Sequence, residues 1–328
     1  MNKLSFGQYS SLLLITDAFT LLCLMGNITA ATLTGFICGA GLQLLLIILC
    51  AFFYKKGGRM TKCAQWFYLI YILIFGGILF AMLWNGAEAL SVPSENFKII
   101  PEKFLITGAI GIVCLYASSY GIKELSRAGV ITAALGVICL AVMILGAASE
   151  WKWSNINLQV SSQSFIKELS RSFAISGGVG SGVLLLRYVR GDEIKYAAWY
   201  YVEKAALYLI IPLVTMAVAG GIMEITDFPV ITAAQLSQLS SSQRIDSLFL
   251  IVFAVMAVFS VALQAVCSAY LIGDLFPKFK RFRSTLSLLI MMGIAFAVTE
   301  IGQYSVIFAV LTAIVPIAVF VGKRRKAK

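Results

Sequence analysis

The chain has 328 residues, of which 60% are hydrophobic, 12% are charged and none is histidine. The absence of histidine excludes Ser–His and Cys–His catalysis and removes the commonest metal ligand, so we expect neither an enzyme nor a metal or cofactor site. The formal net charge of +11 does not require a nucleic-acid partner, because basic residues collect on the cytoplasmic side of membrane proteins.

Ten apolar runs follow one another along the chain. Runs of about 20 residues with almost no charge predict transmembrane helices, and no period-two alternation suggests a barrel. The sequence therefore predicts an all-α polytopic membrane protein of about ten transmembrane helices. The expected spans are 7–26, 30–54, 64–90, 104–120, 128–148, 165–188, 196–222, 246–272, 284–299 and 303–321.

The loops between these spans differ in charge. With the N-terminus inside, one side collects 19 of the 26 basic residues, which lie at Lys3 and in 55–62, 123–127, 187–195, 278–283 and 323–328. The other side collects six, namely Lys98, Lys103, Lys152, Lys167, Arg171 and Arg244. Lysine and arginine in short loops set orientation, so we expect both termini to be cytoplasmic.

The first span carries an acidic residue, Asp17, about ten residues from its start and near mid-membrane. A carboxyl group there costs about 2.5–3.5 kcal/mol and usually faces a bundle interior or a cavity. Asp17, with Thr20 one turn away, is a candidate to bind a ligand ammonium, or to carry a proton. The alternative is an internally hydrogen-bonded carboxyl group that tightens packing.

Ten spans divide into two repeats of five. Because five is an odd number, the second repeat starts on the opposite side of the membrane and is inverted relative to the first. We expect one domain, 1–328, with repeat one at about 7–148 and repeat two at about 165–321. Such 5+5 inverted repeats build many secondary transporters, with a site near the midplane formed by interrupted helices.

The sixth span contains the stretch "AISGGVGSGVLLL" (174–186). Each glycine costs roughly 1 kcal/mol against alanine in a helix interior, which predicts an irregular segment over 176–182. Backbone N–H groups there would hold a ligand carboxylate, which makes ligand-binding candidates of Ser176, Gly177, Gly178, Gly180 and Ser181. The alternative is close helix packing through small residues.

Two later spans carry polar residues. Lys204, beside Glu203, lies about seven residues into the seventh span, near enough to its cytoplasmic end to snorkel, and we expect it to be structural. Ser260 and Gln264 form an i, i+4 pair midway along the eighth span. A hydroxyl group at Ser260 would contact a ligand or ion, or bond a neighbouring helix.

Three segments carry a family resemblance: "PEKF" (101–104), "YASSYGIKELSRAGVI" (116–131) and "FPVITAAQLSQLSSSQRIDSLF" (228–249). Together they resemble the spore germination permease family, the B subunits of nutrient germinant receptors, in the amino acid/polyamine/organocation transporter superfamily. The first span departs from the superfamily pattern, because "LLLITDAFTLLCLMGN" (12–27) stands where a glycine-rich break is usual.

The resemblance implies a LeuT-like transporter fold in the cell or spore inner membrane. It implies a germinant receptor subunit that binds a small ligand of the amino-acid type and acts with companion receptor subunits. The alternative function is an amino-acid permease coupled to a proton or sodium ion.

Overall fold

The computed structural model describes residues 3–56, 58–90, 102–156, 159–189, 192–220, 223, 226–236, 238–240, 243–244, 246–279, 282–298, 305–318 and 323–324. Its helices are α1 (Phe6–Leu22), α2 (Ala30–Lys55), α3 (Lys62–Leu90), α4 (Glu102–Ser119), α5 (Gly121–Ala147), α6 (Ser162–Ile175), α7 (Gly177–Leu185), α8 (Glu193–Ala219), α9 (Pro229–Leu236), α10 (Asp246–Leu275), α11 (Arg283–Val298) and α12 (Ser305–Ile317). The strands are β1 (Gly58–Arg59), β2 (Gln238–Ser240), β3 (Gln243–Arg244) and β4 (Lys323–Arg324).

Each predicted span corresponds to a helix, with α6 and α7 together forming the sixth and the short α9 lying in a loop. By length and apolarity, 5 of the described helices could cross a membrane by themselves, or 6 with the bent pair α6–α7 counted as one span. Three shorter apolar helices lie at Gly108–Ser119, Arg283–Val298 and Val306–Ile317. The first span is an unbroken helix, α1, so it lacks the interruption that is usual in the superfamily.

Local hydrogen bonds fix the starts of several helices. Ser5 caps α1 with Gln8, whose Oε1 accepts from the Ser5 backbone N–H at 3.0 Å. Ser161 caps α6, and its Oγ accepts from the Ser164 backbone N–H at 3.1 Å. Such reciprocal caps satisfy N–H groups that the first helical turn leaves without partners.

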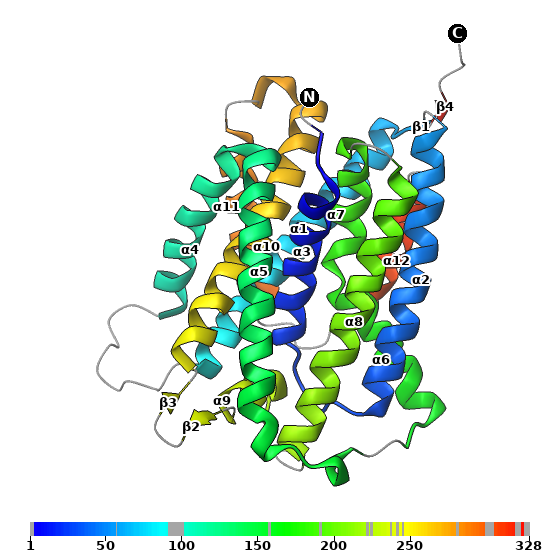
Figure 1. The fold of residues 1–328 in the computed structure, drawn as a ribbon. Coiled ribbons are helices and arrows are strands. Elements are labelled where there is room, and N and C mark those ends of the chain that lie inside the picture. The colour runs from blue at the N-terminus through cyan, green and yellow to red at the C-terminus, as the bar shows by residue number, and fades with distance from the viewer. Residues whose placement is uncertain are drawn as a thin grey trace.

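The described residues of the segments that carry most of the lysine and arginine lie at one end of the bundle, at the top of Figure 1. The Leu4 backbone N–H donates to the Tyr188 carbonyl at 2.7 Å, and β1 pairs antiparallel with β4 near the chain end. At the same end, the Tyr270 hydroxyl accepts from the Ile122 backbone N–H at 3.5 Å. The assignment of this end to the cytoplasm stays a prediction.

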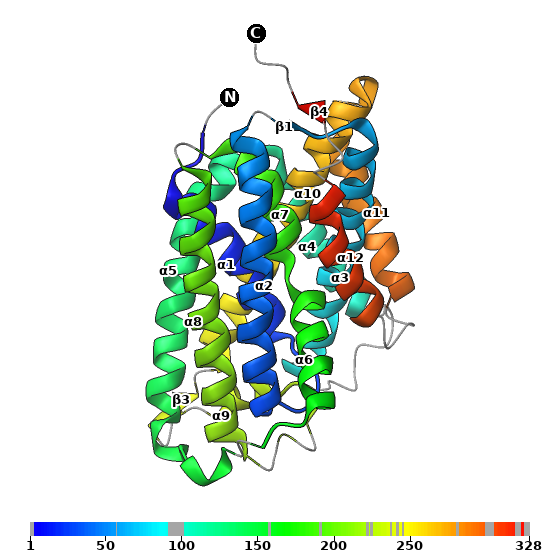
Figure 2. The ribbon, with the colours of Figure 1, turned by 90° about the vertical axis from the view of Figure 1, so that its right-hand side faces the viewer.

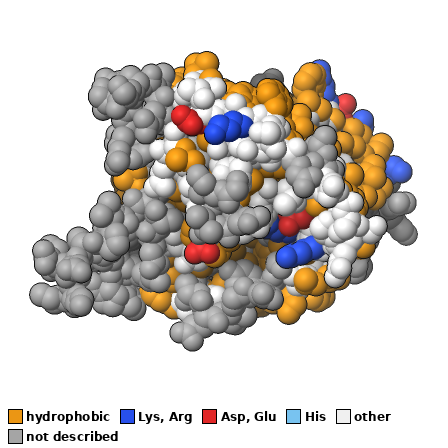
Figure 3. Space-filling model, turned by 90° about the horizontal axis from the view of Figure 1, so that it is seen from below, with side chains coloured by type: hydrophobic (Ala, Val, Ile, Leu, Met, Phe, Trp, Pro, Cys, Tyr) orange, Lys and Arg blue, Asp and Glu red, His pale blue; other side chains and the backbone are white. Residues whose placement is uncertain are grey.

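The opposite end carries α9 and residues 148–156, which follow α5 (Figure 1). Seen from this end, acidic and basic side chains are interspersed and apolar side chains form much of the rim (Figure 3). The described part of this face therefore lacks the basic excess of the other end.

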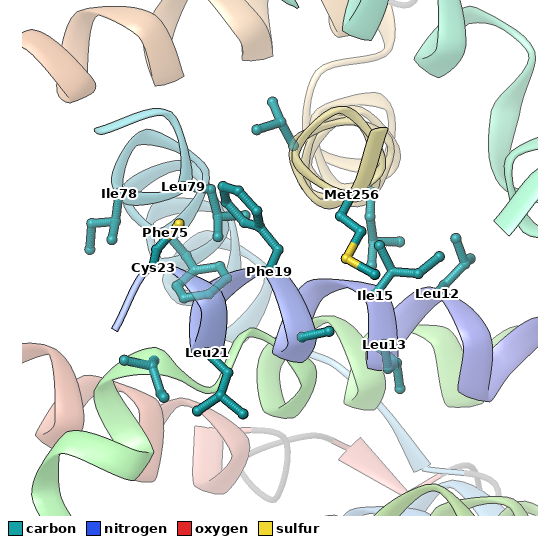
Figure 4. Close-up of a cluster of buried hydrophobic side chains, with 14 of the residues drawn as sticks. Leu12, Leu13, Ile15, Phe19, Leu21, Cys23, Phe75, Ile78, Leu79 and Met256 are labelled. Atoms are coloured by element: carbon teal, nitrogen blue, oxygen red, sulfur yellow. The ribbon is translucent and has the colours of Figure 1, made fainter. Parts of the chain in front are cut away.

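The buried core is centred on α1, which contacts α5, α7, α8 and α10. Figure 4 shows Ile15 near Met256 and Phe19 near Leu79 on the upper side of α1, with Leu13 and Leu21 on the lower side. Phe19 also packs against Phe253 with ring centroids 5.3 Å apart. Neighbouring helices thus cover most faces of α1, and polar residues on it must find their partners inside the protein.

Candidate functional site

The sixth span is interrupted at Ser176. There α6 ends and α7 begins, with φ −78° and ψ 88° at Ser176 and a bend of 44° between the two helices. Figure 2 shows α6 and α7 following each other beside α2. The predicted break is therefore present, but the prediction that 176–182 is irregular is wrong, because Gly177–Leu185 is helical.

The glycines serve close packing within α7. A Cβ atom at Gly178 would overlap the Tyr200 hydroxyl group, and one at Gly180 would overlap the Tyr71 ring. Rings placed directly against the α7 backbone recover packing energy that offsets the low helix propensity of glycine. The packing interpretation thus holds for these glycines, and the break interpretation holds for Ser176.

An ion pair lies at this break. The Lys204 ammonium on α8 is 3.2 Å from Asp17 Oδ1 on α1, and both side chains are fully buried. Lys204 Nζ also donates to Ser176 Oγ at 2.5 Å, and the Tyr200 hydroxyl donates to Asp17 Oδ2. Lys204 therefore does not snorkel to an interface: its ammonium is held at the centre of the bundle.

The carboxylate of Asp17 lies against the first turn of α7. Its Oδ2 would be 3.0 Å from a Cβ atom at Gly178, near the start of the helix. The N-terminal end of a helix carries partial positive charge, which favours an anion at this place. The anion beside the break is thus a carboxylate of the protein itself, and binding of a ligand carboxylate by the backbone N–H groups of 178–181 stays a prediction.

The network continues to α2. Ser176 Oγ donates to Gln43 Oε1 at 2.9 Å, and Gln43 Nε2 donates to the Ser172 carbonyl at 3.2 Å. Three helices (α1, α2 and α8) and the α6–α7 break thereby contribute to one buried polar cluster, formed by Asp17, Gln43, Ser176, Tyr200 and Lys204. We call this set the ion-pair centre.

Aromatic rings enclose the ammonium of Lys204. Its Nζ lies 5.8 Å from the ring centroid of Tyr200, 5.4 Å from that of Tyr201 and 5.1 Å from that of Tyr208. Cation–π contacts of this kind add to the carboxylate in stabilising a charge removed from water.

The other predicted site residues with hydroxyl groups, Thr20, Ser181 and Ser260, already have those groups hydrogen-bonded within the protein. Thr20 Oγ1 donates to the Asp17 carbonyl at 3.0 Å, and Ser260 Oγ donates to the Met256 carbonyl at 2.7 Å, so both bond their own helices. Ser181 Oγ lies 2.9 Å from Gln264 Oε1, which links α7 to α10. The Gln264 Nε2 atom is buried without a hydrogen-bond partner among the described residues.

Sequence reasoning missed Lys204, Tyr200 and Gln43 as members of the centre. A signal for two of them was present, because Tyr200, Lys204 and Tyr208 follow one another at intervals of four residues. That spacing places them on one helix face, where they meet the same neighbours. Gln43 had no comparable signal. Among the described residues, no group of His, Cys, Asp and Glu is suited to hold a metal ion.

A cavity of about 130 Å³ lies on the α9 side of the break. Arg171 and Asn85 are its polar lining residues, and the Arg171 guanidinium is 3.3 Å from the Glu168 carboxylate. Phe308 also lines the cavity and stacks on Phe75 with centroids 5.5 Å apart. The Phe75 ring contacts Gly177, so this aromatic stack separates the cavity from the ion-pair centre.

Comparison with known proteins finds a matching family model and similar solved structures. The sequence model of the family described as "Spore germination protein" matches residues 65–305, and no curated protein matches. The solved structures of Mhp1, a nucleobase-cation-symport-1 family transporter, are similar. The closed, bromovinylhydantoin-bound form has a TM-score of 0.60 at 16% identity, with 97% of this chain and 77% of that chain covered. The inward-facing form has a TM-score of 0.57 at 13% identity, with coverages of 96% and 76%.

The likeness to Mhp1 shows the fold. The chain is an all-α integral membrane protein with the 5+5 inverted-repeat architecture of LeuT-like transporters. The repeat boundaries at about 7–148 and 165–321 remain predictions.

Proposed function

Because this chain belongs to the spore germination protein family, we propose that it is the membrane-embedded subunit of a nutrient germinant receptor. In this proposal the subunit binds a small ligand of the amino-acid type and signals through companion subunits. It resides in the cell or spore inner membrane with both termini in the cytoplasm. The observation that supports a ligand of the amino-acid type is the fully buried Asp17–Lys204 pair at a helix break.

The pair matches the two charges of an amino acid. An ammonium group of the ligand would replace that of Lys204 on Asp17, and the ligand carboxylate would then neutralise Lys204. Removing one partner of a buried ion pair leaves an uncompensated charge, which costs about 3–5 kcal/mol. A zwitterion avoids that cost because it supplies both charges together, whereas a simple amine or a simple carboxylate supplies one. Exchange of ion pairs thus favours zwitterions.

The cavity on the α9 side of the break supports a route to this centre. Arg171 and Asn85 in its wall provide donors for a carboxylate, and the cavity ends at the Phe75–Phe308 stack. A ligand that enters from the α9 end would therefore pass these rings before it reaches Asp17.

Ligand binding to the purified full-length protein in nanodiscs tests the proposal. A panel of amino acids, each with its matched amine and carboxylic acid, is screened by thermal shift and then by calorimetry. We expect a zwitterion to bind and its single-charge analogues to bind at least about tenfold more weakly, which corresponds to about 1.4 kcal/mol. Asp17→Asn keeps the shape of the side chain and should weaken binding by at least about the same factor.

A matched control is Glu124→Gln, which removes a carboxylate that is paired with Arg127 on the exposed surface of α5. This variant should bind like the parent protein. Unchanged affinity in Asp17→Asn, in protein that purifies normally, would contradict the site.

The similarity to a symporter structure favours one other function, an amino-acid permease coupled to a proton or sodium ion. Uptake of a bound amino acid into proteoliposomes distinguishes the two functions. A receptor subunit binds without accumulating its ligand, whereas a coupled permease accumulates the ligand when an ion gradient is imposed.

A further inference from the structure

A second cavity lies away from the ion-pair centre, as a crevice of about 430 Å³ between α5 and α8. In Figure 1, α1 is visible between these two helices, and residues of α1 and α10 line the inner part of the crevice. Val137 of α5 is 68% exposed and Ile210 of α8 is 37% exposed, whereas Phe253 of α10 is 1% exposed. The crevice therefore opens on the side of the bundle, where an integral membrane protein faces lipid.

Among the described residues that line the crevice, Glu203 is the one acidic or basic residue, and the others are apolar residues, a glycine and Cys139. Its Oε2 atom is buried and has no hydrogen-bond partner among the described residues, although the Ser10 side chain bonds the carboxyl group. The neighbouring Lys204 points away, toward Asp17 and Ser176. A carboxylate oxygen in such surroundings costs free energy until a donor reaches it.

We propose that this crevice binds a hydrophobic amine, a molecule with an alkyl chain that ends in an ammonium group. The ammonium would lie at Glu203 and the chain along the apolar walls. Glu203 and Ile211 are eight residues apart on α8, so the crevice runs for about 12 Å along the helix, which suits a chain of about ten carbons.

The carboxylate, rather than the chain, provides the selectivity. Moving an alkyl chain from lipid to an apolar crevice gains almost nothing, since lipid is as apolar as the protein wall. Pairing an ammonium with a carboxylate whose Oε2 atom has no partner gains a charge-assisted hydrogen bond. A lipid acyl chain leaves Glu203 unpaired, and an amino acid brings a carboxylate that this wall cannot pair. The occupant is therefore different from the zwitterion proposed for the ion-pair centre.

Binding of decylamine tests the proposal on the full-length protein in phosphatidylcholine nanodiscs, with decan-1-ol and decanoate as probes of equal chain length. Bound probe is counted by native mass spectrometry. We expect decylamine to bind at least about tenfold more tightly than the other two probes. Glu203→Gln should abolish this preference, and Ala206→Phe, which fills the crevice but keeps the carboxylate, should reduce binding of all three.

Glu124→Gln on the exposed face of α5 is the matched control and should leave the preference unchanged. Equal binding of all three probes, or a preference for decylamine that survives in Glu203→Gln, would overturn the proposal. The first result would identify the crevice as an ordinary lipid-filled groove. Because the amino-acid screen reads a different site, either proposal can fail without the other.

Discussion

Lys204 of α8 and Asp17 of α1 form an ion pair of 3.2 Å in which neither side chain is exposed at all. The two residues are 187 positions apart in the chain, and they meet beside the helix break at Ser176. A buried pair of this kind seldom stabilises a fold more than apolar residues of similar volume would. Its position at the break supports the exchange of charges with a ligand that we propose.

Removing one charge of the pair should destabilise the protein more than removing both. We expect Lys204→Met to lower the free energy of unfolding by about 3–5 kcal/mol, because Asp17 then remains buried without its cation. Lys204→Met combined with Asp17→Leu should recover most of that loss. Thermal and denaturant unfolding of each variant in detergent measures the difference.

The control for this cycle is Arg127→Met, which breaks the exposed Arg127–Glu124 pair and should change stability by less than about 1 kcal/mol. If the double variant lost as much free energy of unfolding as Lys204→Met and Asp17→Leu lose when their separate effects are added, the two charges would not interact.

Alanine at Gly178 should be destabilising, by about 1–3 kcal/mol, because its Cβ atom overlaps the Tyr200 hydroxyl group that bonds Asp17. Gly41 of α2 is the matched position, since no atom lies within 4 Å of a Cβ atom placed there. Gly41→Ala should leave stability unchanged or raise it by up to about 1 kcal/mol through helix propensity. Equal effects at the two positions would argue against the packing role of Gly178.

Ser176→Ala removes the acceptor of Lys204 and the donor to Gln43. We expect a loss of about 1–3 kcal/mol in stability, because buried polar groups are left without partners. Ser260→Ala is the control, since that hydroxyl group bonds a carbonyl of its own helix, and its effect should stay within about 0.5 kcal/mol. Weaker ligand binding in Ser260→Ala would place Ser260 in the ligand site after all.

The native Cys63, which is exposed next to β1, reports the orientation of the basic end. A membrane-impermeant maleimide should label it in permeabilised protoplasts and not in intact ones. Ser154→Cys, at the opposite end and made in a Cys63→Ala background, should show the reverse pattern. Labelling of Cys63 in intact protoplasts would invert the predicted topology.

The sequence by itself determined the spans and the common end of their basic loops. Lipid imposes a local rule, since any run of about 20 residues without polar side chains must become a helix to satisfy its backbone. The long motifs at 116–131 and 228–249 likewise resemble one family without reference to structure, and the family match confirms it.

Only the tertiary structure decided where the sixth span breaks and what neutralises Asp17. Glycine spacing reports a local helix propensity, but it does not show that Tyr200 and Tyr71 occupy the space beside Gly178 and Gly180. The partner of a buried charge is chosen by which helix faces meet. Lys204 therefore resembles a snorkelling lysine in the sequence, and it is held at the centre because α8 packs its face of Tyr200, Lys204 and Tyr208 against α1 and the break.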